Sequence, residues 1–182
     1  MERPSPAEVV GPLLRVHQVR EFTDEPVDGA ALDAIADAAR WSGSSKNSQP
    51  WRFVIIREPA TLRGIHDAGL PSTRSFATAR AAIAIVMPEQ PGRGVSLAYD
   101  EGRAAERVLV AASMLGLGAA IAWVVADGRP TVASLLGLPE DRFVRTIVAI
   151  GHPTDSAKRP RSTGRRARLP REETVFEERW RP

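Results

Sequence analysis

The sequence predicts one mixed domain over residues 1–182, in which helices and strands alternate along the chain. Three observations support this prediction: stretches with helical apolar periodicity, short apolar runs that these stretches separate, and turns rich in glycine and proline between them. Well-separated strands fit a doubly wound α/β protein, and they fit an α+β sheet equally. The pattern alone does not decide between the two.

The first half of the chain begins with a predicted helix over Pro6–Val19, whose apolar residues share one face. Pro26 separates it from a second helix, for which Asp28 is a suitable N-cap because its carboxylate can accept from free backbone N–H groups. The segment 41–50 is a polar loop, and the apolar run 51–57 predicts a strand. Pro59–Ala68 then predicts a short helix.

The second half repeats this alternation. The run 81–87 lacks polar residues and predicts a buried strand, and a loop with proline and glycine follows over 88–94. The longest predicted helix is 96–115, ended by Gly116 or Gly118. Three further elements are a strand over 119–126, a helix over 130–136 and a strand over 146–151. Outside the body, 1–12 forms an N-terminal segment, and 154–182 forms an extended arm that carries Phe176 and Trp180.

Composition narrows the classes of function. The absence of cysteine excludes a disulfide framework, a thiolate metal site and a cysteine nucleophile. The N-terminus lacks the pattern of a secretory signal, and the most apolar stretch, 108–126, is too broken for a membrane span. We therefore expect a cytoplasmic protein without a membrane partner. A net charge of +3 gives no reason to expect nucleic acid, although Lys158 to Arg171 is a basic stretch that could serve an interaction protein.

Motifs of hydrolysis and phosphoryl transfer do not occur in the sequence. The three histidines, His17, His66 and His152, lack the spacing of metal ligands, so no metal site is predicted. No G-x-S-x-G motif, P-loop or G-x-G-x-x-G turn after a strand is found. We therefore predict no catalytic side chain.

Two polar features remain as candidate binding sites. The loop 42–49 offers backbone N–H groups and amide side chains, which suit a planar heterocycle with ring carbonyls and nitrogens. An ordinary turn-rich connection is the alternative. In the tail, Arg166 and Arg168 alternate, so an extended backbone would point both to one side, where they can grip a phosphate. A solvated basic tail explains the same residues.

Taken in order, the motifs resemble the nitroreductase family. The most specific is Asn47-Ser48-Gln49-Pro50-Trp51-Arg52-Phe53, which matches an N-x-Q-P-W-x-F loop and strand. Val19-Arg20-Glu21-Phe22 precedes it, and an alanine-rich helix closing with Gly116-Leu117-Gly118 follows. A strand running into Pro153 and the basic pair before Leu169-Pro170 complete the series. The resemblance covers about residues 13 to 180.

The resemblance implies an α+β fold: a three-layer α/β/α arrangement with a mostly antiparallel central sheet and a C-terminal arm. It implies a homodimer with FMN at the interface, the arm wrapping the partner. The implied flavin-binding residues are Ser44 and Asn47 from the neighbouring subunit, Gln49 close by, His17, Arg20, Arg166 and Arg168 near the phosphate, and the backbone of Ala122 and Trp123 beside the ring. The indole of Trp123 is expected either in an acceptor pocket or in the core.

The implied activity is a ping-pong cycle, in which NADH or NADPH reduces FMN and a small electron-poor acceptor, a nitroaromatic or a quinone, is reduced in turn. One departure concerns the first segment. Many members have two basic residues and a serine where this chain has Val16, His17 and Gln18, and of these His17 can still donate to a phosphate while Val16 cannot. A flavin- or deazaflavin-binding protein without turnover, or a deazaflavin-related reductase, is therefore kept as an alternative.

Overall fold

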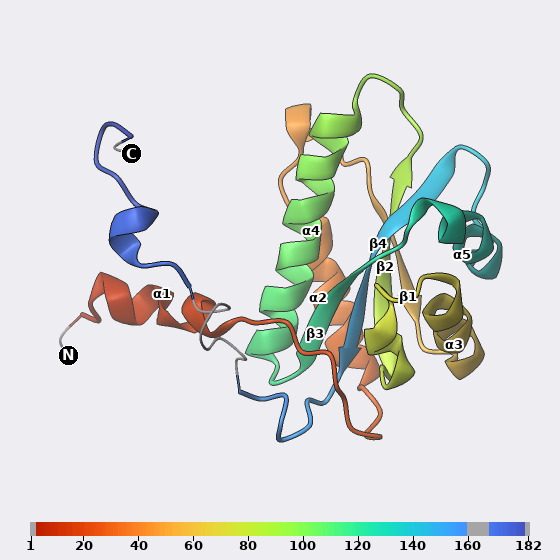
Figure 1. The fold of residues 1–182 in the computed structure, drawn as a ribbon, viewed down its shortest axis with the longest axis horizontal. Coiled ribbons are helices and arrows are strands. Elements are labelled where there is room, and N and C mark those ends of the chain that lie inside the picture. Colours follow the sequence, from red (N-terminus) through yellow and green to blue (C-terminus); the bar gives the residue numbers. More distant parts are fainter. Residues whose placement is uncertain (1–2, 160–167, 181–182) are drawn as a thin grey trace.

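The central sheet of the computed structural model, which describes residues 3–159 and 168–180, has four strands. These are β1 (Arg52–Ile56), β2 (Ala81–Pro88), β3 (Gly118–Trp123) and β4 (Arg142–Gly151). They lie in the order β1-β2-β4-β3, and every neighbouring pair is antiparallel (Figure 1). The doubly wound alternative is therefore wrong, and the α+β class is confirmed.

Helices cover both faces of the sheet, as the three-layer prediction requires (Figure 1). On one face, α2 (Gly29–Arg40) and α4 (Gly94–Met114) share a buried cluster with the odd-numbered residues of β2. On the other face, α3 (Pro59–Ala68) and α5 (Arg129–Leu136) pack against the even-numbered residues. All eight positions of β2 are buried, because successive side chains of a strand point to opposite faces and both faces are covered.

Three predicted boundaries were wrong by three residues or more, and one of them is the end of β3, which stops at Trp123 and not at residue 126. The first helix, α1 (Pro6–Arg15), ends at Arg15 and not at Val19, because Val16 is already extended. β4 begins at Arg142, four residues before the predicted start, and its register shifts opposite Ile85 and Val86. Asp28 occupies the predicted N-cap of α2, but its side chain makes no capping hydrogen bond in the described structure.

α1 and the C-terminal segment 168–180 extend beyond the helical layer of α2 and α4 (Figure 1). α1 begins with a capping box, in which the Ser5 hydroxyl accepts from the Glu8 N–H at 3.3 Å and the Glu8 carboxylate accepts from the Ser5 N–H at 2.8 Å. None of its residues is buried, and Leu14 is 82% exposed. The apolar face that the sequence predicted for this helix therefore has no cover within the described part of the chain.

Candidate functional site

The loop predicted to bind a ring lies between α2 and β1 and is held on α4. The Ser45 N–H donates to both carboxylate oxygens of buried Asp100, at 3.0 and 3.2 Å, and the Gln49 N–H donates to the Ser44 hydroxyl at 2.9 Å. Lys46, Asn47 and Gln49 have φ values of 53°, 51° and 44°. Such left-handed conformations cost non-glycine residues of order 1–3 kcal/mol and gather at functional sites. The loop is thus held in a strained shape.

Arginine side chains fix the end of this loop to the sheet. Arg52 donates to the carbonyl oxygens of Gln49 and Trp51 at 3.2 and 2.7 Å, and Arg142 donates to that of Pro50 at 3.3 Å. Because Pro50 and Trp51 are buried, they anchor the loop while the side chains of Asn47 and Gln49 stay exposed. The exposed amides are therefore available to a ligand, as the sequence predicted for a ring site.

Arg20 belongs to an extended segment that follows α1 and lies on the ends of β3 and β4. The Val19 N–H donates to the Ala119 carbonyl at 2.9 Å, and the Thr23 N–H donates to the His152 carbonyl at 2.8 Å. Beneath the segment, Gly118 and Gly151 pair across the two strands. A Cβ atom at Gly118 would lie 2.6 Å from Val19, and one at Gly151 would lie 2.8 Å from Phe22. The two glycines therefore form a shelf that only a side chain as small as hydrogen permits.

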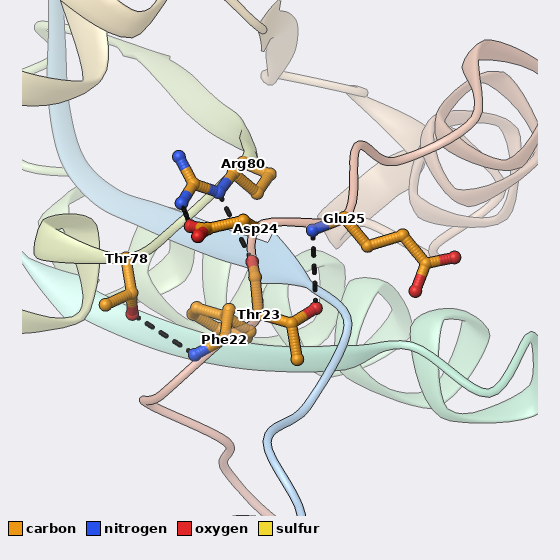
Figure 2. Close-up of polar contacts among 6 residues, drawn as sticks. All are labelled: Phe22, Thr23, Asp24, Glu25, Thr78 and Arg80. Carbon is orange, nitrogen blue, oxygen red and sulfur yellow. Dashed lines mark hydrogen bonds and ion pairs between the residues drawn. The ribbon is translucent and has the colours of Figure 1, made fainter.

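Figure 2 shows a second set of contacts that fixes the same segment. The Phe22 N–H donates to the Thr78 hydroxyl at 3.2 Å, and the Thr23 carbonyl accepts from Arg80 Nε at 3.2 Å. Arg80 also forms an ion pair with Asp24. Together with the glycine shelf, these contacts set the backbone on which Arg20 is displayed.

Arg20 interacts electrostatically with a second cation, Arg74, that sequence reasoning missed. Burial lowers the pKa of Arg20, and the positive charge of Arg74 lowers that pKa further. Arg74 begins η2 (Arg74–Ala77), the short 3-10 turn that is followed by Thr78, so the turn that holds Phe22 also presents this arginine. The repulsion between two positive charges is reduced when an anion binds to both. The two arginines are thus candidates for binding a phosphate, and Arg20 Nη2 donates to Gln18 Oε1 at 2.9 Å in the described structure.

The remaining predicted phosphate residues differ in what the structure shows of them. His17 lies with Nδ1 3.0 Å from the Arg15 carbonyl oxygen and Nε2 3.2 Å from that of Ala157, so its ring is engaged by backbone groups. Arg168 is exposed, and Arg166 lies outside the described residues. In the arm, the Phe176 and Trp180 rings contact each other with their centroids 4.7 Å apart, and Trp180 remains 75% exposed.

β3 connects the phosphate end to the residues predicted beside the ring. Val19 contacts this strand at Ala119, and Trp123 ends it four residues later, about 13 Å away at the rise of a strand. Ala122 is buried, whereas Trp123 is 49% exposed, so the indole is not a core residue of the described chain. Among the described residues, no hydrogen bond or ion pair joins Arg20 to the loop Ser44–Gln49. Asp100, which holds the loop, and Met114, where α4 ends just before β3, are separated by about 21 Å along the helix, so one chain holds the two candidate binding ends apart.

Two buried acids of α4 were also missed by sequence reasoning. Asp100 holds the loop, and Glu101 forms an ion pair with Arg145 on β4. Both fall at helical spacing from the buried Leu97 and Val108, so each acid stands on the apolar face of the helix. An acidic residue on the apolar face of a predicted helix is a signal that can be read from the sequence, because a buried carboxylate requires a partner.

Comparisons with known proteins agree with these observations. The model of the nitroreductase family matches residues 17–101. The FMN reductase (NAD(P)H) of Bacillus subtilis strain 168 is 30% identical over 173 residues, which cover 85% of this chain and 70% of that protein. The oxygen-insensitive NADPH nitroreductase of Salmonella typhimurium is 29% identical over 180 residues, 90% of this chain and 71% of that protein.

The fold is shared with solved structures as well. An FMN-dependent nitroreductase from Clostridium difficile R20291 superposes with a TM-score of 0.80 at 21% sequence identity, covering 94% of this chain and 99% of that chain. Within the described residues, none of the helices combines the length and apolarity that crossing a bilayer requires. Given the family match and the extent of the similarity to the Bacillus subtilis protein, this chain belongs to the nitroreductase family.

Proposed function

We propose that the protein is an NAD(P)H-dependent FMN oxidoreductase that acts as a homodimer and reduces electron-poor acceptors such as nitroaromatics or quinones. The observation that carries this proposal is the pair of ends described above. The cations Arg20 and Arg74 suit a phosphate, and the exposed amides of the Ser44–Gln49 loop suit a flavin ring. The relatives named as an NAD(P)H-linked FMN reductase and an NADPH nitroreductase support the same activity.

The donor set fits FMN chemically. The strained loop offers backbone N–H groups and the amides of Asn47 and Gln49 to a planar heterocycle, and the arginines offer guanidinium groups to its phosphate. The flavin supplies the hydride chemistry when bound, accepting from the nicotinamide and giving to the acceptor in a ping-pong cycle. The side chains bind and orient the ring, and none is proposed as a general acid.

A homodimer accounts for the separation of the two ends. One chain holds Arg20 and the loop Ser44–Gln49 apart, so we propose that the loop of one subunit completes the site of the other. Exposed apolar groups are available for the contact: Leu14 on α1 and Val95, Tyr99 and Met114 on α4 are 82%, 76%, 73% and 79% exposed. We also propose a cytoplasmic location, which the absence of cysteine favours.

The phosphate assignment is tested with Arg20→Ala combined with Arg74→Ala, and separately with Arg166→Ala combined with Arg168→Ala. Each guanidinium bond to a phosphate is worth about 1.5–3 kcal/mol, so each double variant is expected to weaken FMN binding at least tenfold. Affinity for riboflavin, which lacks the phosphate, should stay unchanged. Unchanged FMN affinity in a double variant would contradict the role of that pair.

A matched control removes two exposed arginines from elsewhere. Arg57→Ala combined with Arg63→Ala changes the net charge equally and should leave FMN binding unchanged. Activity is then tested by adding NADH or NADPH anaerobically to the FMN-loaded protein, which should bleach the flavin absorbance within seconds. FMN binding without bleaching by either nucleotide would favour the alternative, a flavin-binding protein without turnover. The observation behind that alternative is that Val16 and Gln18 stand where many family members have a basic residue and a serine.

A further inference from the structure

Four side chains, those of Arg129, Phe143, Arg145 and Trp123, form an alternating row of cations and aromatic rings. Arg129 Cζ lies 5.6 Å from the Phe143 centroid, and Arg145 Cζ lies 5.7 Å from Phe143 and 5.3 Å from the Trp123 centroid. These distances are those of cation–π contacts. The row Arg129–Phe143–Arg145–Trp123 ends on an indole that is 49% exposed.

Arg145 is the fixed member of this row. Its Nε donates to Glu101 Oε2 at 3.0 Å, and its Nη2 donates to the same oxygen. The side chain of Glu101 is 3% exposed and that of Arg145 is 19% exposed. The strand places Arg145 there through a bulge: Ile85 pairs with Thr146 and Val86 with Val144, which leaves Arg145 as the extra residue. A bulge re-aims a side chain, here toward α4.

Stability alone is a weak explanation for this buried pair. Desolvation of two buried charges tends to offset their attraction, and apolar replacements of similar volume are often as stable. Glu101 Oε1 is buried with no hydrogen-bond partner among the described residues, which adds to the cost. What the pair does provide is geometry, since a planar guanidinium held at two nitrogens fixes the plane of the ring stacked on it. The function of the pair is therefore to be found at Trp123, the ring that the guanidinium holds.

The row is attached to the candidate ring site through neighbouring residues of α4. Asp100 accepts from the Ser45 N–H of the loop, and the next residue, Glu101, holds Arg145. The same turn of helix thus fixes both the loop and the indole. The Arg145 guanidinium carbon lies over the Trp123 ring at 5.3 Å from its centroid, and Trp123 is half exposed at the end of β3.

We infer that Trp123 is a stacking platform for a planar conjugated ring, and that Arg145, held by Glu101, is the positioning residue of this platform. The identity of the ring rests on the proposed function: it is the ring of the acceptor or the dihydronicotinamide of the donor. A cation behind the indole favours rings on which negative charge develops, as it does on an acceptor during reduction.

The test compares Trp123→Leu with a pair variant, Arg145→Met combined with Glu101→Leu, which leaves no unpaired buried charge. Menadione serves as the planar acceptor and ferricyanide, which is not planar, as the reference. Aromatic stacking supports an increase of about tenfold in KM for menadione, relative to that for ferricyanide, in Trp123→Leu. The pair variant should raise this KM about threefold, because the indole remains but is no longer held.

The combination of both changes isolates the positioning role. If Arg145 acts through Trp123, the triple variant is no worse than Trp123→Leu alone, because the effects are coupled and not additive. If the effects of the two changes on KM multiply in the triple variant, Arg145 does not act through Trp123. The matched control is Arg40→Met: Arg40 stacks on Trp41 at 5.6 Å, but both are exposed and no buried acid holds the arginine. It should change none of these constants.

A binding readout does not depend on turnover. Quenching of tryptophan fluorescence by menadione should saturate, and the saturable part should be lost in Trp123→Phe and Trp123→Leu but not in Arg40→Met. Unchanged quenching in both Trp123 variants, together with an unchanged KM, overturns the platform. The dissociation constant of NADH, from the rate of anaerobic flavin reduction, shows whether the donor ring uses it as well. Wild-type protein that neither binds nor reduces FMN would contradict the proposed function. The fluorescence quenching would still show whether Trp123 binds a planar ring.

Discussion

The glycine shelf allows a prediction whose magnitude follows from the structure. In Gly151→Ala, the new Cβ would lie 2.8 Å from Phe22 Cβ and Cγ, whereas ordinary contact begins at 3.4 Å, so the buried ring must retreat by about 0.6 Å. Overpacking of this kind costs about 1–3 kcal/mol, and loss of a flexible glycine from the unfolded chain offsets about 0.4–1 kcal/mol of it. We expect a net loss of about 1–2 kcal/mol.

The functional consequence should accompany the loss of stability. Phe22 and Arg20 belong to one short segment, so displacing the ring is expected to shift the backbone that carries the Arg20 guanidinium. Thermal unfolding should show a Tm lower by about 2–8 °C, from about 2–4 °C per kcal/mol for a chain of this size. Titration should show a dissociation constant for FMN that is about three- to tenfold higher, with riboflavin unaffected.

Two companion variants make the outcome decisive. Gly102→Ala is the same substitution inside α4, where nothing in the described structure lies within 4 Å of the added Cβ, so it should raise the free energy of unfolding by up to about 1 kcal/mol. Phe22→Ala, added to Gly151→Ala, removes Cγ and Cδ1, two of the three Phe22 atoms that crowd the new Cβ, and should recover part of the FMN affinity. If Gly151→Ala keeps both Tm and FMN affinity while Gly102→Ala behaves as expected, the shelf does not position Arg20.

Three further predictions concern α1 and the strained loop. Leu14→Glu places a charge on the apolar face of α1 and should raise the dimer dissociation constant at least about tenfold, measured by sedimentation equilibrium; an unchanged constant would remove α1 from the interface. Lys46→Gly relieves a φ of 53° and should stabilise the fold by about 0.5–1 kcal/mol, whereas Ser48→Gly, at a φ of −72°, should destabilise it by a similar amount in chemical denaturation. The pKa of Glu8 is lowered from 4.5 because the hydroxyl and N–H of Ser5 donate to its carboxylate, so this cap is fully present above pH 4.5 and is lost as the pH falls through the lowered pKa. NMR titration of the Glu8 carboxyl should show that lowered pKa in the wild type and a return toward 4.5 in Ser5→Ala.

Local pattern was sufficient to place most elements but not to pair them. The predicted bounds of the helix Pro59–Ala68 match those observed, because its apolar face and initial proline are local signals. The end of α1 was misplaced since Val19 is drawn out of the helix by the carbonyl of Ala119, a contact across 100 residues that no periodicity reports. Strand direction likewise depends on which distant runs meet, so the antiparallel order came from the resemblance and not from the pattern.

The candidate site divides in the same way. The loop around Asn47 was predicted from its residues, since its polar and amide side chains are contiguous in one short motif, whereas its left-handed backbone was not predicted. Arg74 and Arg145 were missed because their roles depend on partners far along the chain, Arg20 and Glu101. Arg145 was further hidden because it lies just before the predicted start of the last strand, in a stretch to which the sequence analysis assigned no element.

α1 also bears on how the protein can be measured. An isolated helix of ten residues is marginal in water, and α1 buries none of its own residues, so its helical form depends on whatever covers its apolar face. In the proposed homodimer that cover is the second copy, and the helix–coil equilibrium of α1 is then linked to association by mass action. Dilution would unravel α1 while the sheet stays intact, and the melting temperature would rise with protein concentration.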